Sequence, residues 1–259
     1  MAAPKVKTGW DSKTDKSGGG GDVFRFYMPQ GADPTEITFL DDVTEGYTFK
    51  DPDSEETYHF DAPVIFDEHQ LKLNGSWMNW FTCIAGIEEG VPCPLCAAND
   101  SASEIAIFTV IDHSKFTSNR TQRVYKDQKK LYVVKTNTMT FDLVRELQDD
   151  EAKKNKKGEV TEPGNIRGLR VRVKRMGGNT SPNVGNNFKV LDRYEEDDVI
   201  FTGKDWDNRE EGEDPKDKDF KLSDLQPYNY LEEFQTKKAS ALKQVSQVIA
   251  NEGEDPVPF

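Results

Sequence analysis

Residues 83–96 read Cys83-Ile84-Ala85-Gly86-Ile87-Glu88-Glu89-Gly90-Val91-Pro92-Cys93-Pro94-Leu95-Cys96, and they include all three cysteines of the chain. Pro92 and Pro94 restrict the backbone of the Cys-x-x-Cys turn, which directs both of its thiols toward one point. Three thiolates and one imidazole form a closed tetrahedral zinc set. The sequence therefore predicts one structural Zn2+ bound by Cys83, Cys93, Cys96 and a histidine. Two alternatives stay open: free buried thiols, or a disulfide that leaves one cysteine over.

The fourth ligand is predicted to be His69. Asn74-Gly75 is a hairpin-turn signal between this histidine and Cys83. Two short strands joined by that turn would fold the imidazole back toward the first cysteine. His59 stands in an alternating strand-like segment and His113 follows an apolar run, so we interpret both as surface or strand histidines.

Length and composition limit the class of protein. A chain of 259 residues, 35% hydrophobic and 31% charged, fits one large or two small domains with long solvated segments. No apolar run approaches the ~18 residues of a membrane span. Residues 1–21 form a polar, Gly-rich segment that we interpret as a flexible tail and not as a signal peptide. We therefore expect no membrane partner and a cytoplasmic location, that of the host cell if the protein is viral.

The charge of the chain is divided between acidic ends and a basic centre. Between residues 115 and 175, 17 basic and 8 acidic residues give a net charge of +9 in a chain of net charge −13. A basic centre of this kind fits a core that binds a polyanion.

The hydrophobic pattern predicts a mainly β protein. Residues 168–175 alternate with period two, which places apolar side chains on one face and cations on the other. Residues 140–148 have helical spacing, and 149–165 and 177–187 are expected to be loops. Short strands around one helix favour a small barrel that binds single strands. The predicted strands are 23–29, 37–40, 47–50, 57–66, 105–111, 123–125, 130–136, 168–175 and 188–193.

Binding of unpaired nucleotides needs cations for phosphates and flat rings for bases. Each such residue could instead belong to the core or to a solvated face, but together they favour binding. The candidate contacts are Lys115, Arg120, Arg123, Tyr125, Lys126, Lys129, Lys130, Tyr132, Lys135, Arg170, Arg172 and Lys174, and Phe116 offers a further ring in the same segment.

The pattern His69-x-x-Lys72-x-Asn74-Gly75-x-Trp77, followed by the C-x9-C-x2-C cysteines, resembles the single-stranded-DNA-binding (helix-destabilising) proteins of T-even-like bacteriophages. The resemblance covers roughly residues 22–193. It implies an OB-fold barrel with an inserted zinc-binding subdomain at about 67–99, which binds single-stranded DNA in phage DNA replication, recombination and repair. By the same resemblance, Arg25 would line the DNA cleft.

This chain departs from the family at two places. The N-terminal Lys-Arg-Lys-Ser-Thr-type motif for cooperative self-association is absent, so self-association along DNA would need another contact. The loop 177–187 lacks the aromatic residues that the family carries there.

The C-terminal region 194–259 is predicted to contain an acidic linker, a helix at about 227–250 and an acidic tip. The tip residues Asp255, Pro256, Val257, Pro258 and Phe259 are similar to the tips of bacterial single-stranded-DNA-binding proteins, which recruit replication and repair proteins. A terminal Phe can fill an apolar pocket while neighbouring acids steer the encounter. The acidic region 192–259 could also compete with DNA for the basic core, which a truncation at about 192 would test.

The favoured function is a non-enzymatic single-stranded-DNA-binding protein without strong sequence preference. The alternative is a zinc-ribbon protein that acts in protein interaction or transcription. A zinc-dependent nucleobase deaminase is disfavoured because no histidine begins a His-x-Glu motif, and because Cys83 would fill the position that a catalytic water needs.

Overall fold

The computed structural model describes residues 24–50, 57–73, 76–85, 91–117, 124–178, 181–204, 216–234 and 242–247. The predicted tail 1–21, the tip 255–259 and the candidate contacts Arg120 and Arg123 lie outside these residues. The described chain is mainly β with a large mixed sheet, which confirms the predicted class. None of the described helices is long and apolar enough to cross a lipid bilayer.

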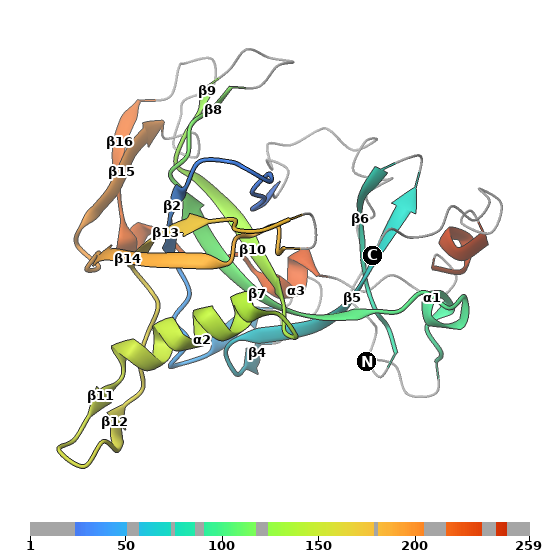
Figure 1. The fold of residues 1–259 in the computed structure, drawn as a ribbon, viewed down its shortest axis with the longest axis horizontal. Helices are drawn as coiled ribbons and strands as arrows, with labels where there is room; N and C mark the ends of the chain where they lie inside the picture. Colours follow the sequence, from blue (N-terminus) through green and yellow to red (C-terminus); the bar gives the residue numbers. More distant parts are fainter. Residues whose placement is uncertain are drawn as a thin grey trace.

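The large sheet is organised around strand β7 (Ser103–Asp112), which contains the predicted apolar run (Figure 1). One edge of β7 pairs with β10; the other pairs first with β5 (Val64–Leu73) and then with β2. Because both edges and both faces are covered, residues 105–111 are buried. The main path through the sheet is β1 (Phe24–Arg25), β10 (Gln128–Lys135), β7, β2 (Thr35–Phe39), β13 (Leu169–Lys174) and β14 (Asn187–Arg193).

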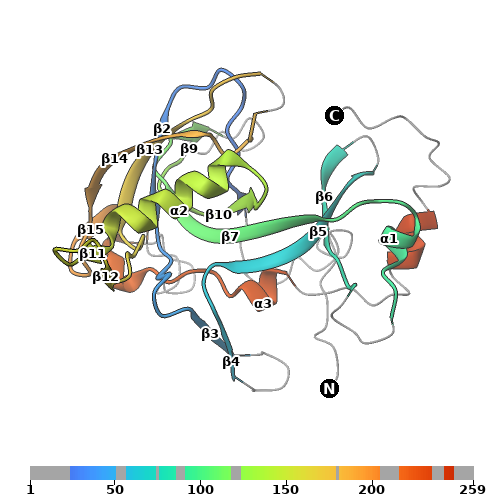
Figure 2. The same cartoon turned by 60° about the horizontal axis from the view of Figure 1, so that its bottom comes forward.

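Four of these strands follow a Greek-key order. Strands β2, β7 and β10 are antiparallel neighbours, and β13 returns to the free side of β2. Helix α2 (Met139–Glu151) connects β10 to β13 and covers one face of the sheet, with Val144 and Leu147 in the core (Figure 2). This confirms the helix predicted at 140–148.

Backbone contacts of the segment after β1 extend its pairing with β10 and reach the turn between β13 and β14, at the other end of the sheet path. The N–H of Phe26 donates to the carbonyl of Leu131 (2.7 Å), and the N–H of Met28 donates to the carbonyl of Asn183 (2.7 Å), between β13 and β14. The sheet therefore curls around its main core. Tyr132 is fully buried there and packs against Phe26 and Phe39.

The opposite face of β7 and β10 is covered by a hairpin and by the C-terminal segment. The hairpin consists of β3 (Tyr47–Lys50) and β4 (Thr57–Phe60), and the segment contributes helix α3 (Tyr230–Glu233). Leu131 and Ile107 of the sheet pack in this second cluster.

The buried carboxylate of Asp41 holds this second layer together. It accepts hydrogen bonds from the Tyr47 hydroxyl (2.9 Å), the Tyr230 hydroxyl (2.5 Å) and the backbone N–H of Thr109 (2.6 Å). Asp41 and Tyr230 are both fully buried. The C-terminal segment is thus part of the fold.

The C-terminal region departs from its prediction. The expected linker contains a hairpin of β15 (Val199–Lys204) and β16 (Asp217–Lys221), because Ile200 and Leu222 pack on Leu40 and Ile111. A 3-10 turn, η2 (Leu222–Asp224), follows this hairpin. Helix begins at Tyr230 and not at 227, and the second described helical piece is 242–247.

Three smaller units project from the sheet (Figure 1). Strand β5 extends beyond β7 and pairs with β6 (Ser76–Thr82), followed by helix α1 (Pro94–Ala97); we call this unit the metal subdomain. The predicted loop 149–165 carries a hairpin of β11 (Lys153–Lys154) and β12 (Val160–Glu162). A third hairpin, β8 (Phe116–Thr117) with β9 (Val124–Tyr125), connects β7 to β10.

Candidate metal centre and nucleic-acid surface

The predicted metal ligands come together in the metal subdomain. His69 lies on β5, Cys83 directly follows β6, and Cys93 and Cys96 lie at the start of α1. Pairing of β5 with β6 sets His69 opposite Phe81, and the N–H of Cys83 donates to the carbonyl of Asp67 (2.7 Å). As a result, the four ligand atoms all lie within 4.8 Å of one another.

The spacing of these atoms fits a tetrahedral metal site. Zinc bonds of about 2.3 Å to sulfur and about 2.0 Å to nitrogen separate tetrahedral ligands by about 3.8 Å (S to S) and about 3.5 Å (S to N). The Sγ atoms of Cys83 and Cys96 are 3.6 Å apart. The Nε2 atom of His69 lies 3.5 Å from the Sγ of Cys93 and 3.6 Å from that of Cys96. The cluster is therefore compatible with a single metal ion.

Asp100 completes the site and was not predicted from the sequence. Its Oδ2 lies 2.6 Å from Nδ1 of the buried His69 ring. A proton on Nδ1 donated to this carboxylate leaves Nε2 free to bind a metal, and such partners also fix the ring orientation. The feature of the sequence that could have identified it is an acidic residue shortly after the Cys-x-x-Cys turn.

The thiols differ in how readily they ionise. Burial raises the pKa of the Cys83 thiol to about 12. Burial also opposes ionisation of Cys93, but backbone hydrogen bonds from Cys96, Ile84 and Leu95 lower the pKa of its thiol to about 7. A bound divalent cation would stabilise all three thiolates, and its binding would release protons.

An apolar shell surrounds the cluster. Leu95 and Ile84 are fully buried beside the cysteines, and Leu242 from the second C-terminal helical piece packs on them. All four tetrahedral positions have a protein ligand, so the arrangement resembles structural sites, in which no position is open for water.

Several predicted nucleic-acid contacts are engaged within the protein. Both guanidinium nitrogens of Arg25 bond the carboxylate of Glu68, one of them at 2.7 Å, and the guanidinium lies 4.2 Å from the Trp80 ring centre. Lys130 pairs with Asp112 at 2.6 Å.

Two more predicted contacts on β10 are partly or fully covered. Lys129 lies 4.2 Å from the ring centre of Tyr228, and burial lowers the pKa of its ammonium group. The prediction that Tyr132 contacts DNA is wrong, because its ring lies in the core and its hydroxyl donates to the carbonyl of Val184 (2.8 Å).

Other predicted contacts reach solvent. Lys115, Lys126, Lys135 and Lys174 are exposed. Tyr125 is half-buried because its ring stacks on Phe116, with centroids 6.3 Å apart.

The two remaining predicted cations, on β13, face carboxylates. Arg170 pairs with Asp192, and Arg172 pairs with Glu36. The expected alternation of β13 is confirmed, with Leu169, Val171 and Val173 buried.

Three exposed aromatic residues can serve as contacts; Phe116 was among the rings noted in the segment 115–135, whereas Phe24 and Tyr27 were missed. Phe24, Tyr27 and Phe116 are 53%, 58% and 55% exposed, respectively. Phe24 lies opposite Lys130 in the parallel pairing of β1 with β10, and the β8–β9 hairpin joins β10 near the same end. The sequence pattern hides Phe24 and Tyr27, because hydrophobic residues in strands are normally assigned to the core.

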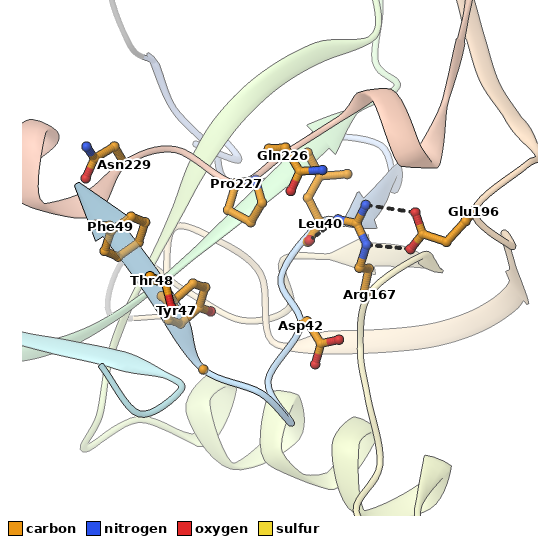
Figure 3. A pocket seen from close by; sticks show the side chains of 11 residues that line it. Leu40, Asp42, Tyr47, Thr48, Phe49, Arg167, Glu196, Gln226, Pro227 and Asn229 are labelled. Atoms are coloured by element: carbon orange, nitrogen blue, oxygen red, sulfur yellow. Dashed lines mark hydrogen bonds and ion pairs between the residues drawn. The ribbon is translucent and has the colours of Figure 1, made fainter. Parts of the chain in front are cut away.

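A hollow of about 660 Å3 lies between the end of β2, strand β3 and the C-terminal segment (Figure 3). Its most prominent cation, Arg167, donates to both carboxylate oxygens of Glu196 and to the carbonyls of Leu40, Leu222 and Leu225. Its guanidinium thus braces these segments and is not free to bind an anion.

Comparison of the chain with protein-family models, with curated proteins and with solved structures gave no match. The function is therefore inferred from the residues and their geometry.

Proposed function

We propose that this is a non-enzymatic single-stranded-DNA-binding protein with a structural Zn2+. The observation that carries the proposal is the set of exposed rings on β1, just after β1 and on the β8–β9 hairpin, with exposed lysines next to that hairpin. Phe24, Tyr27 and Phe116 can stack on bases, while Lys115 and Lys126 can meet phosphates. Single-stranded-DNA-binding surfaces combine these two features, and every base offers a flat face, so little sequence preference is expected.

The proposal includes an OB-type barrel for the core. An OB fold is a five-stranded, partly open Greek-key barrel. Strands β2, β7, β10, β13 and β14 supply five strands in a Greek-key arrangement, and α2 lies between the third and fourth. The link from Met28 to Asn183 supports partial closure.

The metal subdomain is proposed to be an insertion held by Zn2+ through His69, Cys83, Cys93 and Cys96. The ligand set, sulfur-rich and closed, suits zinc better than metals that prefer oxygen ligands. The role assigned to the ion is to stabilise the fold. The resemblance to the T-even-like phage proteins supports roles in phage DNA replication, recombination and repair, with partner proteins recruited by the tip 255–259.

Titration of oligo-dT with the full-length, zinc-loaded protein tests the function. Affinity should fall steeply with salt, with a log–log slope of about −0.7 for each phosphate contact. Duplex DNA of equal length should bind more weakly. No binding of oligo-dT at low salt would refute the proposal and favour a protein-binding role for the zinc fold.

A matched pair of variants tests the aromatic surface. Tyr27→Ala should weaken oligo-dT binding by about 1–3 kcal/mol if the ring stacks on a base. Met139→Ala is the control, because Met139 on α2 has a similar exposure of 57%, against 58% for Tyr27. Equal affinities for the two variants would exclude Tyr27 from the binding surface.

A further inference from the structure

The exposed side of β13 and its two neighbours carries more cations than carboxylates. In the strand register, Glu36 of β2 and Lys189 of β14 lie on either side of Arg172. The carboxylates of Glu36 and Asp192 pair with two of the four cations on this side, Arg170 and Arg172. The other two cations, both lysines, make no ion pair with any residue that the structure describes. The cluster consists of Arg170, Arg172, Lys174, Lys189, Glu36 and Asp192.

Glu36 lies between two guanidinium groups. Its Oε1 accepts a hydrogen bond from Arg172 at 2.7 Å, and its Oε2 lies 3.6 Å from Arg170. The hydrogen bond from Arg172 lowers the pKa of Glu36, which favours the carboxylate. Arg170 is held separately by Asp192 through two bonds of 2.7 and 2.5 Å. Glu36 is therefore the carboxylate that can leave without releasing Arg170.

The pair between Glu36 and Arg172 is open to water. The Arg172 side chain is 47% exposed and that of Glu36 is 31% exposed. Ion pairs of this exposure are weak and are screened by salt. A guanidinium binds phosphate with the same planar donors that it offers to a carboxylate. A phosphate oxygen can therefore replace Glu36 at little energetic cost.

We propose that Arg170 and Arg172 form a phosphate subsite for single-stranded DNA, which Glu36 occupies in the free protein. The inference rests on the proposed function. Lys174 and Lys189 flank the subsite and would attract the neighbouring phosphates of the strand. Binding exchanges an internal carboxylate for a phosphodiester, so Glu36 limits the affinity for DNA.

Charge-removing variants of the full-length protein test this exchange with labelled oligo-dT. Glu36→Gln should raise the affinity about two- to fivefold at low salt, the factor that corresponds to a surface ion pair. Glu162→Gln is the control, since Glu162 forms a similar exposed pair with Lys153 at 2.6 Å on the β11–β12 hairpin.

The Arg172→Gln background separates a local from a general charge effect. There, Glu36→Gln should raise the affinity clearly less than in the unaltered protein, because only the longer contact of Glu36 with Arg170 at 3.6 Å remains. An equal gain from Glu36→Gln and Glu162→Gln, or a gain that is undiminished without Arg172, would overturn the subsite and leave the proposed function intact. Failure of the unaltered protein to bind oligo-dT would overturn both.

Discussion

Substitution of Asp41 by Asn tests the buried network that fastens the C-terminal segment to the sheet. Burial raises the pKa of Asp41 from 3.8 to about 6, although three hydrogen bonds favour its ionised form. At about 1.4 kcal/mol per pKa unit, the ionised carboxylate lowers the free energy of unfolding at neutral pH by about 3 kcal/mol relative to the protonated one. The additional stability of the protein with a protonated Asp41 is fully present below pH 3.8, the pKa of the unfolded state. It is lost as the pH rises through the folded-state pKa of about 6.

Asn is neutral at every pH, can accept from the Thr109 N–H and can donate to a tyrosine oxygen. From pH 7.5 to pH 5.0, the unfolding free energy of the unaltered protein should therefore rise by about 1.3 kcal/mol relative to Asp41→Asn. Urea unfolding of both proteins with equal zinc measures this difference, because any loss of metal affects both. Parallel pH profiles would refute the reasoning and show that the three hydrogen bonds outweigh burial.

Three further outcomes follow from single side chains. Asp100→Ala should lower Zn2+ affinity about 10- to 100-fold, because His69 loses its orienting partner. Competition with a chromophoric chelator measures this affinity, and an unchanged affinity would count against that role of Asp100. Tyr132→Phe should leave oligo-dT affinity unchanged and lower the free energy of unfolding by about 1 kcal/mol, because the hydrogen bond to Val184 is lost. Weaker DNA binding by this variant would contradict the buried position of Tyr132. Leu242→Ala should destabilise the protein by about 2–5 kcal/mol in urea unfolding, and a negligible change would mean that this helix does not cover the metal subdomain.

Local patterns in the sequence predicted local features of the structure. The cysteine spacing and His69 predicted the metal cluster, because β5 and β6 form a hairpin whose strands are close in sequence. Helix α2 was predicted for the same reason, since its helical spacing depends only on neighbouring residues.

Features that depend on distant pairing were not predictable. Glu36 meets Arg172 across 136 positions, and Arg25 meets Glu68 across 43. Tyr132 lies in a basic, aromatic segment, but one face of β10 lines the core and the other is covered by the C-terminal segment. The β15–β16 hairpin was missed because its high acidic content obscured Ile200.

The C-terminal segment fastens two parts of the molecule, with Tyr230 on the sheet and Leu242 on the metal subdomain. A protein shortened at about residue 192 would lose both anchors and expose two apolar surfaces. A change in its DNA affinity would then combine the effect of partial unfolding with any relief from acidic competition. The boundary for such an experiment lies after residue 247, where the acidic tip can be removed while both anchors stay in place.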